Sequence, residues 1–132
     1  HTVCTTIHSN SCNSTYRRMM TLAKRKYNMD DSVLMQIMVE AYPVVVFTKQ
    51  LEDRSRKIME IIEGEDYLDG KLLYRSLYKY DVVDNVTLEG GETHVVGHHR
   101  KMCSISDGLI KRLLDNGISH KELEEFTGKV VD

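Results

Sequence analysis

Hydrophobic and polar positions first follow the pattern of a strand and then recur with the period of a helix. Residues 2–7 are mostly β-branched or apolar and predict a short strand, which the polar residues 9–11 end in a turn. Apolar side chains within residues 16–27 then return every three or four positions, as on one face of a helix. Asn13 or Ser14 is the expected cap of that helix, because short polar side chains accept hydrogen bonds from its free backbone N–H groups.

A second helix is expected between two boundary signals. Asp30 or Asp31 can begin it, since aspartate is favoured where a helix starts. Pro43 should end it, because the residue that precedes a proline avoids helical geometry. The apolar positions between these signals share one side, so this helix is expected to pack on a core.

Strand-like patterns follow in the middle of the chain. Residues 44–49 and 56–63 are rich in β-branched and alternating apolar positions, and the turn-like residues 51–55 join them, so this stretch predicts a β-hairpin. The polar residues 64–70 are expected to form a connection. Residues 71–83 then predict a further strand whose tyrosines pack against neighbouring strands.

A hairpin and two short helices are expected in the last third of the chain. Residues 86–96 have strand-like arms around a Gly-Gly pair, which favours a tight turn. Ser106 is the expected cap of a helix that ends at Gly117, because glycine suits the left-handed conformation after a helix. A last helix is expected to open with a capping box of Ser119 and Glu122.

Composition narrows the class of protein without naming a function. The chain has 132 residues, the length of one domain, and a net charge of -2, which argues against a general polyanion-binding role. Its longest apolar run, residues 44–47, is far shorter than a bilayer-spanning helix, and three cysteines are too few for a disulfide framework. A soluble protein of a reducing, cytoplasmic compartment is expected. Residues 128–132 should fray, and the start inside an apparent strand suggests a fragment of a longer protein.

Positive charge gathers on the first predicted helix. Arg17, Lys24 and Arg25 lie opposite its apolar stripe, and Arg18 and Lys26 flank them. This face is either a solvated surface or a contact for phosphate, for an acidic partner or for nucleic acid.

Histidine and cysteine residues raise further hypotheses. His8, at the end of the first predicted strand, either faces a ligand or bonds a loop carbonyl. A cysteine nucleophile would need Cys4 or Cys12 against His8, which a spacing of four residues along a strand or turn does not provide. Neither group of candidate zinc ligands has the paired-cysteine spacing of a structural zinc site. These groups are Cys4, His8 and Cys12, and His94, His98, His99 and Cys103.

Three stretches of the sequence resemble one protein family. They are TTIHSNS at residues 5–11, STYRRMM at residues 14–20 and QLEDRSRKIMEI at residues 50–61. Together they are similar to the C-terminal half of the ATPase core of type II and type IV secretion and conjugal-transfer ATPases, which are hexameric RecA-like P-loop motors. The likeness runs from residue 1 to about residue 80, includes the strand KLLYRSLYKY, and suggests a member from a Gram-positive mobile element.

The family motif called the His box reads TT-hydrophobic-H-(A/S)-N-S. His8 matches its histidine, Thr6 and Asn10 match the polar neighbours, and Arg18 matches an arginine of the next helix. The resemblance implies that these four are the catalytic candidates, with His8 near the γ-phosphate of ATP. In the later hairpin, Arg56 is implied to contact phosphate or a neighbouring subunit. The matching hairpin residues are Leu51, Asp53, Ser55, Arg56, Glu60 and Ile61.

Two hairpin positions depart from the family pattern, because Gln50 replaces an arginine and Arg54 replaces the turn glycine. The implied fold is α/β, the C-terminal half of a RecA-like core, which is α+β as an isolated fragment with a β-hairpin, a second antiparallel hairpin region and a C-terminal helical pair. Residues 1–80 would be the ATPase portion and residues 81–132 a branch-specific extension.

The sequence contains no G-x-x-x-x-G-K-[ST] loop and no apolar strand that ends in an acidic residue. The fragment alone is therefore expected to have no cofactor and no ATPase activity, and ATP and Mg²⁺ are implied only for the intact protein. The implied partners are further copies in a hexamer and inner-membrane components of a secretion or conjugation apparatus, without direct contact to nucleic acid. The resemblance implies a cytoplasmic protein, peripheral to the membrane through its partners. The open alternative is a non-catalytic interaction module, stabilised by zinc in one version.

Overall fold

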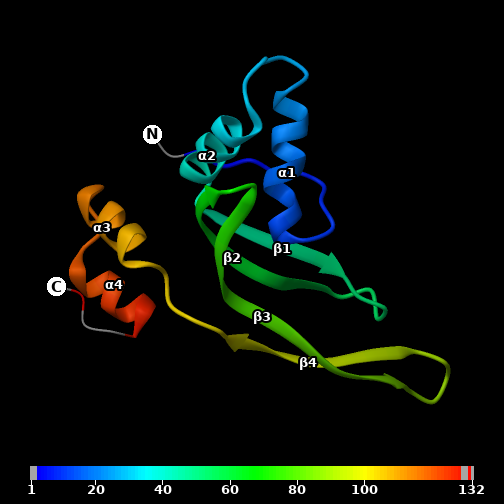
Figure 1. Ribbon diagram of the computed structural model, residues 1–132. Coiled ribbons are helices and arrows are strands. Elements are labelled where there is room, and N and C mark those ends of the chain that lie inside the picture. The colour runs from blue at the N-terminus through cyan, green and yellow to red at the C-terminus, as the bar shows by residue number, and fades with distance from the viewer. Residues whose placement is uncertain (1–2, 129–130, 132) are drawn as a thin grey trace.

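A computed structural model describes residues 3–128 and residue 131. Its four strands form one antiparallel sheet in the order β1-β2-β3-β4, and helices lie beside it (Figure 1). The fold is therefore α+β. Its elements are α1 (Cys12–Ala23), α2 (Asp31–Ala41), β1 (Val44–Gln50), β2 (Arg56–Leu68), β3 (Lys71–Thr87), β4 (Thr93–Lys101), α3 (Asp107–Asp115) and α4 (His120–Thr127).

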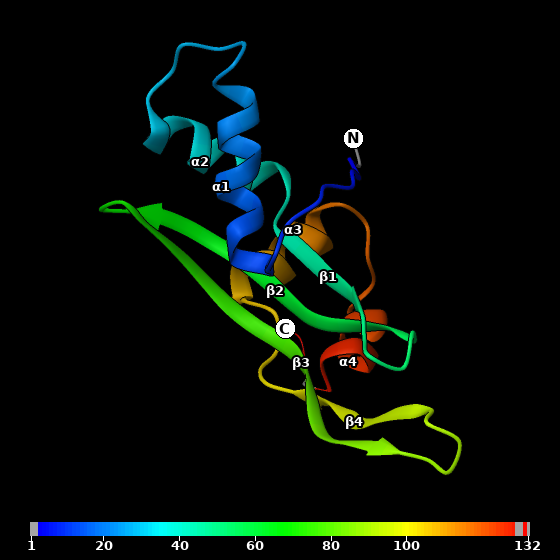
Figure 2. The same ribbon diagram turned by 90° about the vertical axis from the view of Figure 1, so that its right-hand side faces the viewer.

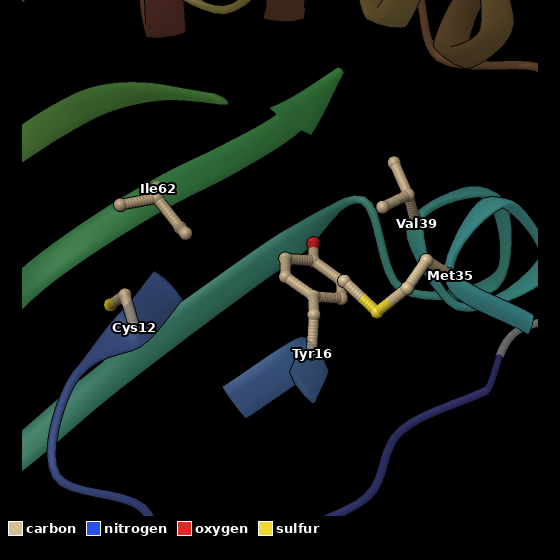
Figure 3. Packing of buried hydrophobic residues seen from close by; sticks show 5 residues of the cluster. All are labelled: Cys12, Tyr16, Met35, Val39 and Ile62. Atoms are coloured by element: carbon tan, nitrogen blue, oxygen red, sulfur yellow. The ribbon is translucent and has the colours of Figure 1, made fainter. Parts of the chain in front are cut away.

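Helices pack on both faces of the sheet, because neighbouring side chains of a strand point to opposite faces. Ile62 of β2 is fully buried beneath α1 and α2 (Figure 3). Its neighbour Ile61 packs against residues from the C-terminal part of the chain. The first core consists of Cys12, Tyr16, Met35, Val39 and Ile62. The second core consists of Leu77, Ile105, Leu123 and Val131.

The boundaries of the helices agree closely with the sequence signals, with one exception. Helix α2 begins at Asp31 after the cap residue Asp30 and ends before Pro43, as predicted. The predicted cap of α1 at Asn13 or Ser14 is wrong. Ser11 caps α1, because its side-chain oxygen accepts a hydrogen bond from the Ser14 backbone N–H at 3.3 Å.

The two C-terminal helices confirm their predicted caps. Ser106 accepts a hydrogen bond from the Leu109 backbone N–H, and Ser119 forms the expected capping box with Glu122. Gly117 follows α3 with φ +95°, in the left-handed region. The prediction that residues 128–132 fray is wrong at Val131, which is buried in the second core. Residues 129, 130 and 132 lie outside the described part of the chain.

The predicted opening strand is wrong where the structure describes it, because residues 3–7 belong to no strand. Strand β1 pairs with β2 on one side only, and no described strand pairs with residues 3–7. A strand exists only through hydrogen bonds to a neighbour, so β propensity alone does not create one. Residue 2 lies outside the described residues.

The predicted polar connection at residues 64–70 is also wrong. Strand β2 continues to Leu68, and Asp69 and Gly70 alone form the turn, with φ of 51° and 75°. Gly64 lies inside β2, where a Cβ atom would come within 2.6 Å of the Tyr16 Oη. Gly64 is therefore explained by the close approach of Tyr16, and not by a turn.

Strand β3 is the longest element and has two different surroundings. Residues from Lys71 to Lys79 pair with β2, whereas residues from Tyr78 to Thr87 pair with β4. The expected hairpin around Gly90 and Gly91 is confirmed as the connection of β3 to β4. We call residues 82–96, which form a two-stranded ribbon extending from the sheet, the arm (Figures 1 and 2). The expected border between residues 80 and 81 falls within β3.

Candidate anion-binding groove

An open groove of about 550 Å³ lies where the N-terminal segment turns into α1. Three residues of the His-box resemblance, His8, Asn10 and Arg18, line it together. We call this hollow the His8 groove. Its full lining is His8, Ser9, Asn10, Ser14, Arg17, Arg18 and Thr21, none of which is acidic.

Serine hydroxyl groups fix the chain at the base of the His8 groove. The Ser9 Oγ lies 2.6 Å from the Ser14 Oγ and donates to the Ser11 carbonyl at 3.2 Å. The Ser14 hydroxyl donates to the same carbonyl at 3.1 Å. These contacts join the segment before α1 to the first turn of the helix, so His8 and Asn10 are held beside the helix start.

The position of the groove favours negative ligands. Free backbone N–H groups and the helix dipole make the first turn of a helix electropositive. Arg17 and Arg18 follow one turn later, and neither forms an ion pair with another described residue. The ion pairs of the described residues are Lys24–Asp31, Arg75–Glu65, Lys79–Glu60 and Arg100–Asp81. Two uncompensated guanidinium groups therefore border a groove without a carboxylate.

Thr6 and Arg56 lie apart from this group. Thr6 lines a neighbouring groove of about 630 Å³ between the N-terminal segment and β1, which we call the strand-edge groove; His8 borders both grooves. Arg56 pairs with Gln50 at the start of β2 and lines neither groove. The structure thus gathers three of the four catalytic candidates and separates the cofactor-binding candidate from them.

Sequence reasoning did not assign Ser9, Ser14, Arg17 and Thr21 to the site. A signal was present, because Ser14, Arg17, Arg18 and Thr21 are spaced by three or four residues and share one helical face. Arg17 was recognised only as part of a basic face. Ser9 carried no signal of its own, since its role depends on the turn that brings it against Ser14.

Cys12 is not a nucleophile for this site. The Cys12 side chain is fully buried and donates to the carbonyl of Glu60 at 3.4 Å. Burial, followed by the charge of Glu60, raises the pKa of the Cys12 thiol to about 12. A thiol with that pKa is a poor source of thiolate near neutral pH, so Cys12 is a core residue.

The candidate zinc ligands of β4 are not brought together. His98 pairs with Asp81 across the ladder, and His99 turns to the other face, where its Nε2 lies 3.0 Å from the Ile58 carbonyl oxygen. Cys103 donates to the Ser76 carbonyl. Within the described residues, no three His, Cys, Asp or Glu side chains are grouped as metal ligands would be. The geometry of His94, His98, His99 and Cys103 therefore does not support the zinc hypothesis.

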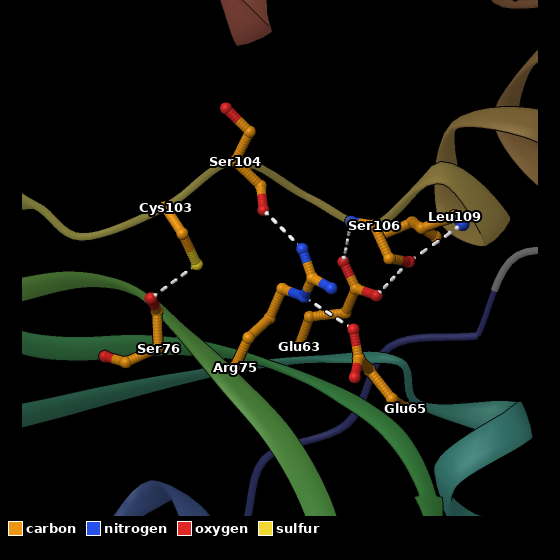
Figure 4. Close-up of polar contacts among 8 residues, drawn as sticks. All are labelled: Glu63, Glu65, Arg75, Ser76, Cys103, Ser104, Ser106 and Leu109. Atoms are coloured by element: carbon orange, nitrogen blue, oxygen red, sulfur yellow. Dashed lines mark hydrogen bonds and ion pairs between the residues drawn. The ribbon is translucent and has the colours of Figure 1, made fainter.

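A second polar cluster joins the sheet to α3 and has a structural role (Figure 4). The buried Glu63 carboxylate accepts from the Ser106 backbone N–H at 2.8 Å and from its hydroxyl. Arg75 donates to Glu65 at 2.5 Å and to the Ser104 carbonyl at 3.3 Å. Because these groups satisfy one another, the cluster fastens α3 to β2 and β3 and offers no free group for chemistry.

No protein-family model matches the chain, and no curated protein matches it either. No helix within the described residues is long and apolar enough to cross a membrane.

Proposed function

We propose that this chain is the C-terminal part of the RecA-like core of a secretion or conjugal-transfer ATPase, in which the His8 groove faces the terminal phosphate of ATP. The observation that carries the proposal is the meeting of His8, Asn10 and Arg18 in one groove that contains no acidic residue. These residues are separated in sequence by up to ten positions, and in the sequence only the motif resemblance connects them. Their convergence supports a common ligand.

The groups in the groove suit a phosphate. A guanidinium group presents a planar fork of N–H donors that matches two phosphate oxygens, and Arg17 and Arg18 supply two such forks. The Asn10 amide adds a neutral donor. ATP with Mg²⁺, bound mainly by other parts of the intact protein, would supply the phosphoryl group. Arg18 and His8 would then stabilise the negative charge that develops during its transfer.

The strand-edge groove is the second support for an incomplete ATPase core. One wall is the extended segment at residues 4–9, and the other wall is β1, whose outer edge pairs with no described strand. Both walls are rich in β-branched residues. A further strand of the proposed core would fill this groove and pair with both walls, so residues 2–7 would become the strand that their sequence predicts.

The hairpin loop between β1 and β2 is the third support. Arg54 has φ 64°, the left-handed conformation that a glycine adopts without strain. The family pattern has its turn glycine at this position. A left-handed backbone at the position of the family's turn glycine supports the proposal.

The proposal is tested by titrating the chain with tripolyphosphate and measuring the heat of binding at about 50 mM salt, where screening is weak. Loss of a charged hydrogen-bond donor costs about 1.5–3 kcal/mol, so Arg18→Ala should weaken binding about tenfold or more. Arg18→Lys should bind with intermediate strength, since it keeps the charge and loses the fork. His8→Ala should also weaken binding.

Lys111→Ala is the matched control, because it removes one positive charge from the exposed surface of α3, outside the His8 groove. It should leave the affinity unchanged. Equal losses in Lys111→Ala and Arg18→Ala would mean that only net charge matters, and would refute the site. The chain alone should not hydrolyse ATP, and steady turnover would contradict the proposed division of the core.

A further inference from the structure

Charge is divided between two distant parts of the sequence. Residues 3–29 contain Arg17, Arg18, Lys24, Arg25 and Lys26 and no acidic residue. Residues 80–97 contain Asp81, Asp84, Glu89 and Glu92 and no lysine or arginine. The first stretch includes α1 and the loop that follows it, and the second includes the arm.

These two charged regions lie at opposite ends of the molecule. In both ribbon views the loop after α1 lies at one extreme and the tip of the arm at the other, with the sheet between them (Figures 1 and 2). They therefore cannot neutralise each other within one copy. Two copies arranged head to tail can bring them together.

Both regions keep charges that no ion pair of the described residues uses. Lys24 is paired with Asp31 and Asp81 with Arg100. The ion pairs of the described residues include neither Arg25 nor Lys26 on one region, and neither Glu89 nor Glu92 on the other. These charges are available to a partner of the opposite sign.

Each region also exposes apolar side chains beside its charges. Leu22 and Tyr27 are exposed next to Arg25 and Lys26, and we call these four residues together with Lys24 the basic end. Val83, Val86 and Leu88 are exposed on the arm. A two-stranded ribbon has little stability by itself, so the arm would gain from a surface that covers it. Apolar contact with charge pairs around it is the usual composition of a protein interface.

We propose that the arm of one copy of this chain docks on the basic end of a second copy. The contact is heterologous, since it joins two different surfaces, and repeated contacts would generate a ring or an open filament. Glu89 and Glu92 at the arm tip face Arg25 and Lys26 of the next copy, and the exposed valine and leucine side chains cover Leu22 and Tyr27. This contact needs no nucleotide and does not depend on the function proposed for the His8 groove.

Sedimentation of the full chain without nucleotide tests the contact, first at about 50 mM salt and then at about 500 mM salt, which screens exposed charges. The wild-type chain should associate with increasing concentration at low salt and dissociate at high salt. In variant A, Arg25→Glu with Lys26→Glu, the association constant should fall by about tenfold or more. In variant B, Glu89→Lys with Glu92→Lys, the association constant should fall by a similar factor. Both pairs are exposed, and circular dichroism verifies that the variants fold.

A charge swap separates this contact from general electrostatic attraction. Variants A and B mixed together should associate in alternation, because the normal arm of A fits the normal basic end of B and the reversed arm of B fits the reversed basic end of A. Both reversals in one chain should restore association. The control pair Lys121→Glu with Glu125→Lys, on the exposed face of α4, should behave as wild type. A monomeric wild-type chain, or a failure of the combined reversal to restore association, would overturn the proposal.

Discussion

The two halves of β3 are both strands of the same sheet and have very different surroundings. The half that pairs with β2 contains Leu77, which is buried in the second core, and Leu72, which packs against the first core. The half that pairs with β4 contains apolar residues too, yet Val83 is 65% exposed and Val86 is 39% exposed. Helices cover the first half, whereas no described helix covers the arm. A strand-like sequence pattern therefore predicts the extended conformation, whereas the stability of the strand depends on the elements that pack against it.

The largest expected effect is a contrast between the helix-covered part of the sheet and the arm. Ile62 is fully buried in the covered part of the sheet. Ile62→Ala should therefore lower the free energy of unfolding of the chain by about 2–5 kcal/mol. Val86→Ala in the arm should cost less than about 0.5 kcal/mol. Urea unfolding of both variants measures the difference. Similar losses would mean that the arm is part of a packed core.

A smaller loss is expected for Gly64→Ala in the covered part of the sheet. The new Cβ atom would collide with the buried Tyr16 ring, whose hydroxyl donates to the Tyr42 carbonyl, and overpacking of this kind costs about 1–3 kcal/mol. Gly108→Ala is the matched control. Gly108 lies in α3, where the nearest atom to an added Cβ is the Ser106 Oγ at 3.8 Å. The control should be neutral or stabilising by up to about 1 kcal/mol, and equal destabilisation of both variants would contradict the packing at Tyr16.

A gain of stability is expected in the loop that joins β1 to β2. Arg54 has φ 64°, so Arg54→Gly should stabilise the chain by about 1 kcal/mol, less the entropy that glycine adds to the unfolded state. Lys57→Gly, in the extended β2 strand, should instead destabilise by about 0.5–1 kcal/mol. Thermal unfolding distinguishes the two signs. A destabilising Arg54→Gly would argue against the left-handed turn.

The smallest expected effect concerns the link between this loop and the arm. Asp53 accepts hydrogen bonds from the Ser55 hydroxyl at 2.5 Å and backbone N–H at 3.0 Å, and from the Val95 N–H of β4 at 3.2 Å. The bonds to Ser55, the hydroxyl first, lower the pKa of Asp53 from 3.8 to about 2. A lowered carboxylate pKa stabilises the fold above pH 3.8, and this contribution is lost as the pH falls towards 2.

Asp53→Asn tests this link, since it removes the charge and keeps the shape. The difference in melting temperature between wild type and Asp53→Asn should be largest above pH 3.8 and shrink as the pH approaches 2. A difference that does not change with pH would show that the Asp53 charge has no part in holding the loop.

Local signals in the sequence were sufficient for α2, α3 and α4, whereas the cap of α1 was misplaced. Pro43, Ser106 and the capping box of Ser119 and Glu122 act within one turn of chain, so their effect can be predicted without the fold. The Asp69-Gly70 turn was also visible in principle, because this dipeptide favours two-residue hairpins.

Long-range packing accounts for the failures. Glycine is typical of turns, so Gly64 was predicted to lie in a connection. It lies in a strand instead, because the Tyr16 side chain of α1 leaves no room for a Cβ atom at this position. The predicted opening strand is wrong for residues 3–7 because no described strand pairs with them.

In the candidate site, too, some residues were indicated by local sequence and others depend on the folded structure. His8, Asn10 and Arg18 could be predicted from motif resemblance, whereas Ser9 depended on a contact with Ser14 that only the folded turn creates. The separation of Arg56 from the other candidates is likewise a property of the hairpin register.

The central claim, that the His8 groove binds the terminal phosphates of a nucleotide, is tested most directly by nuclear magnetic resonance of the labelled chain during titration with tripolyphosphate. Saturable shifts of the amide signals should centre on residues 8–18, and the signals of residues 24–26 and of the lysine and arginine of α3 should change little. Shifts centred on the basic end, or spread over all basic residues, would contradict this claim.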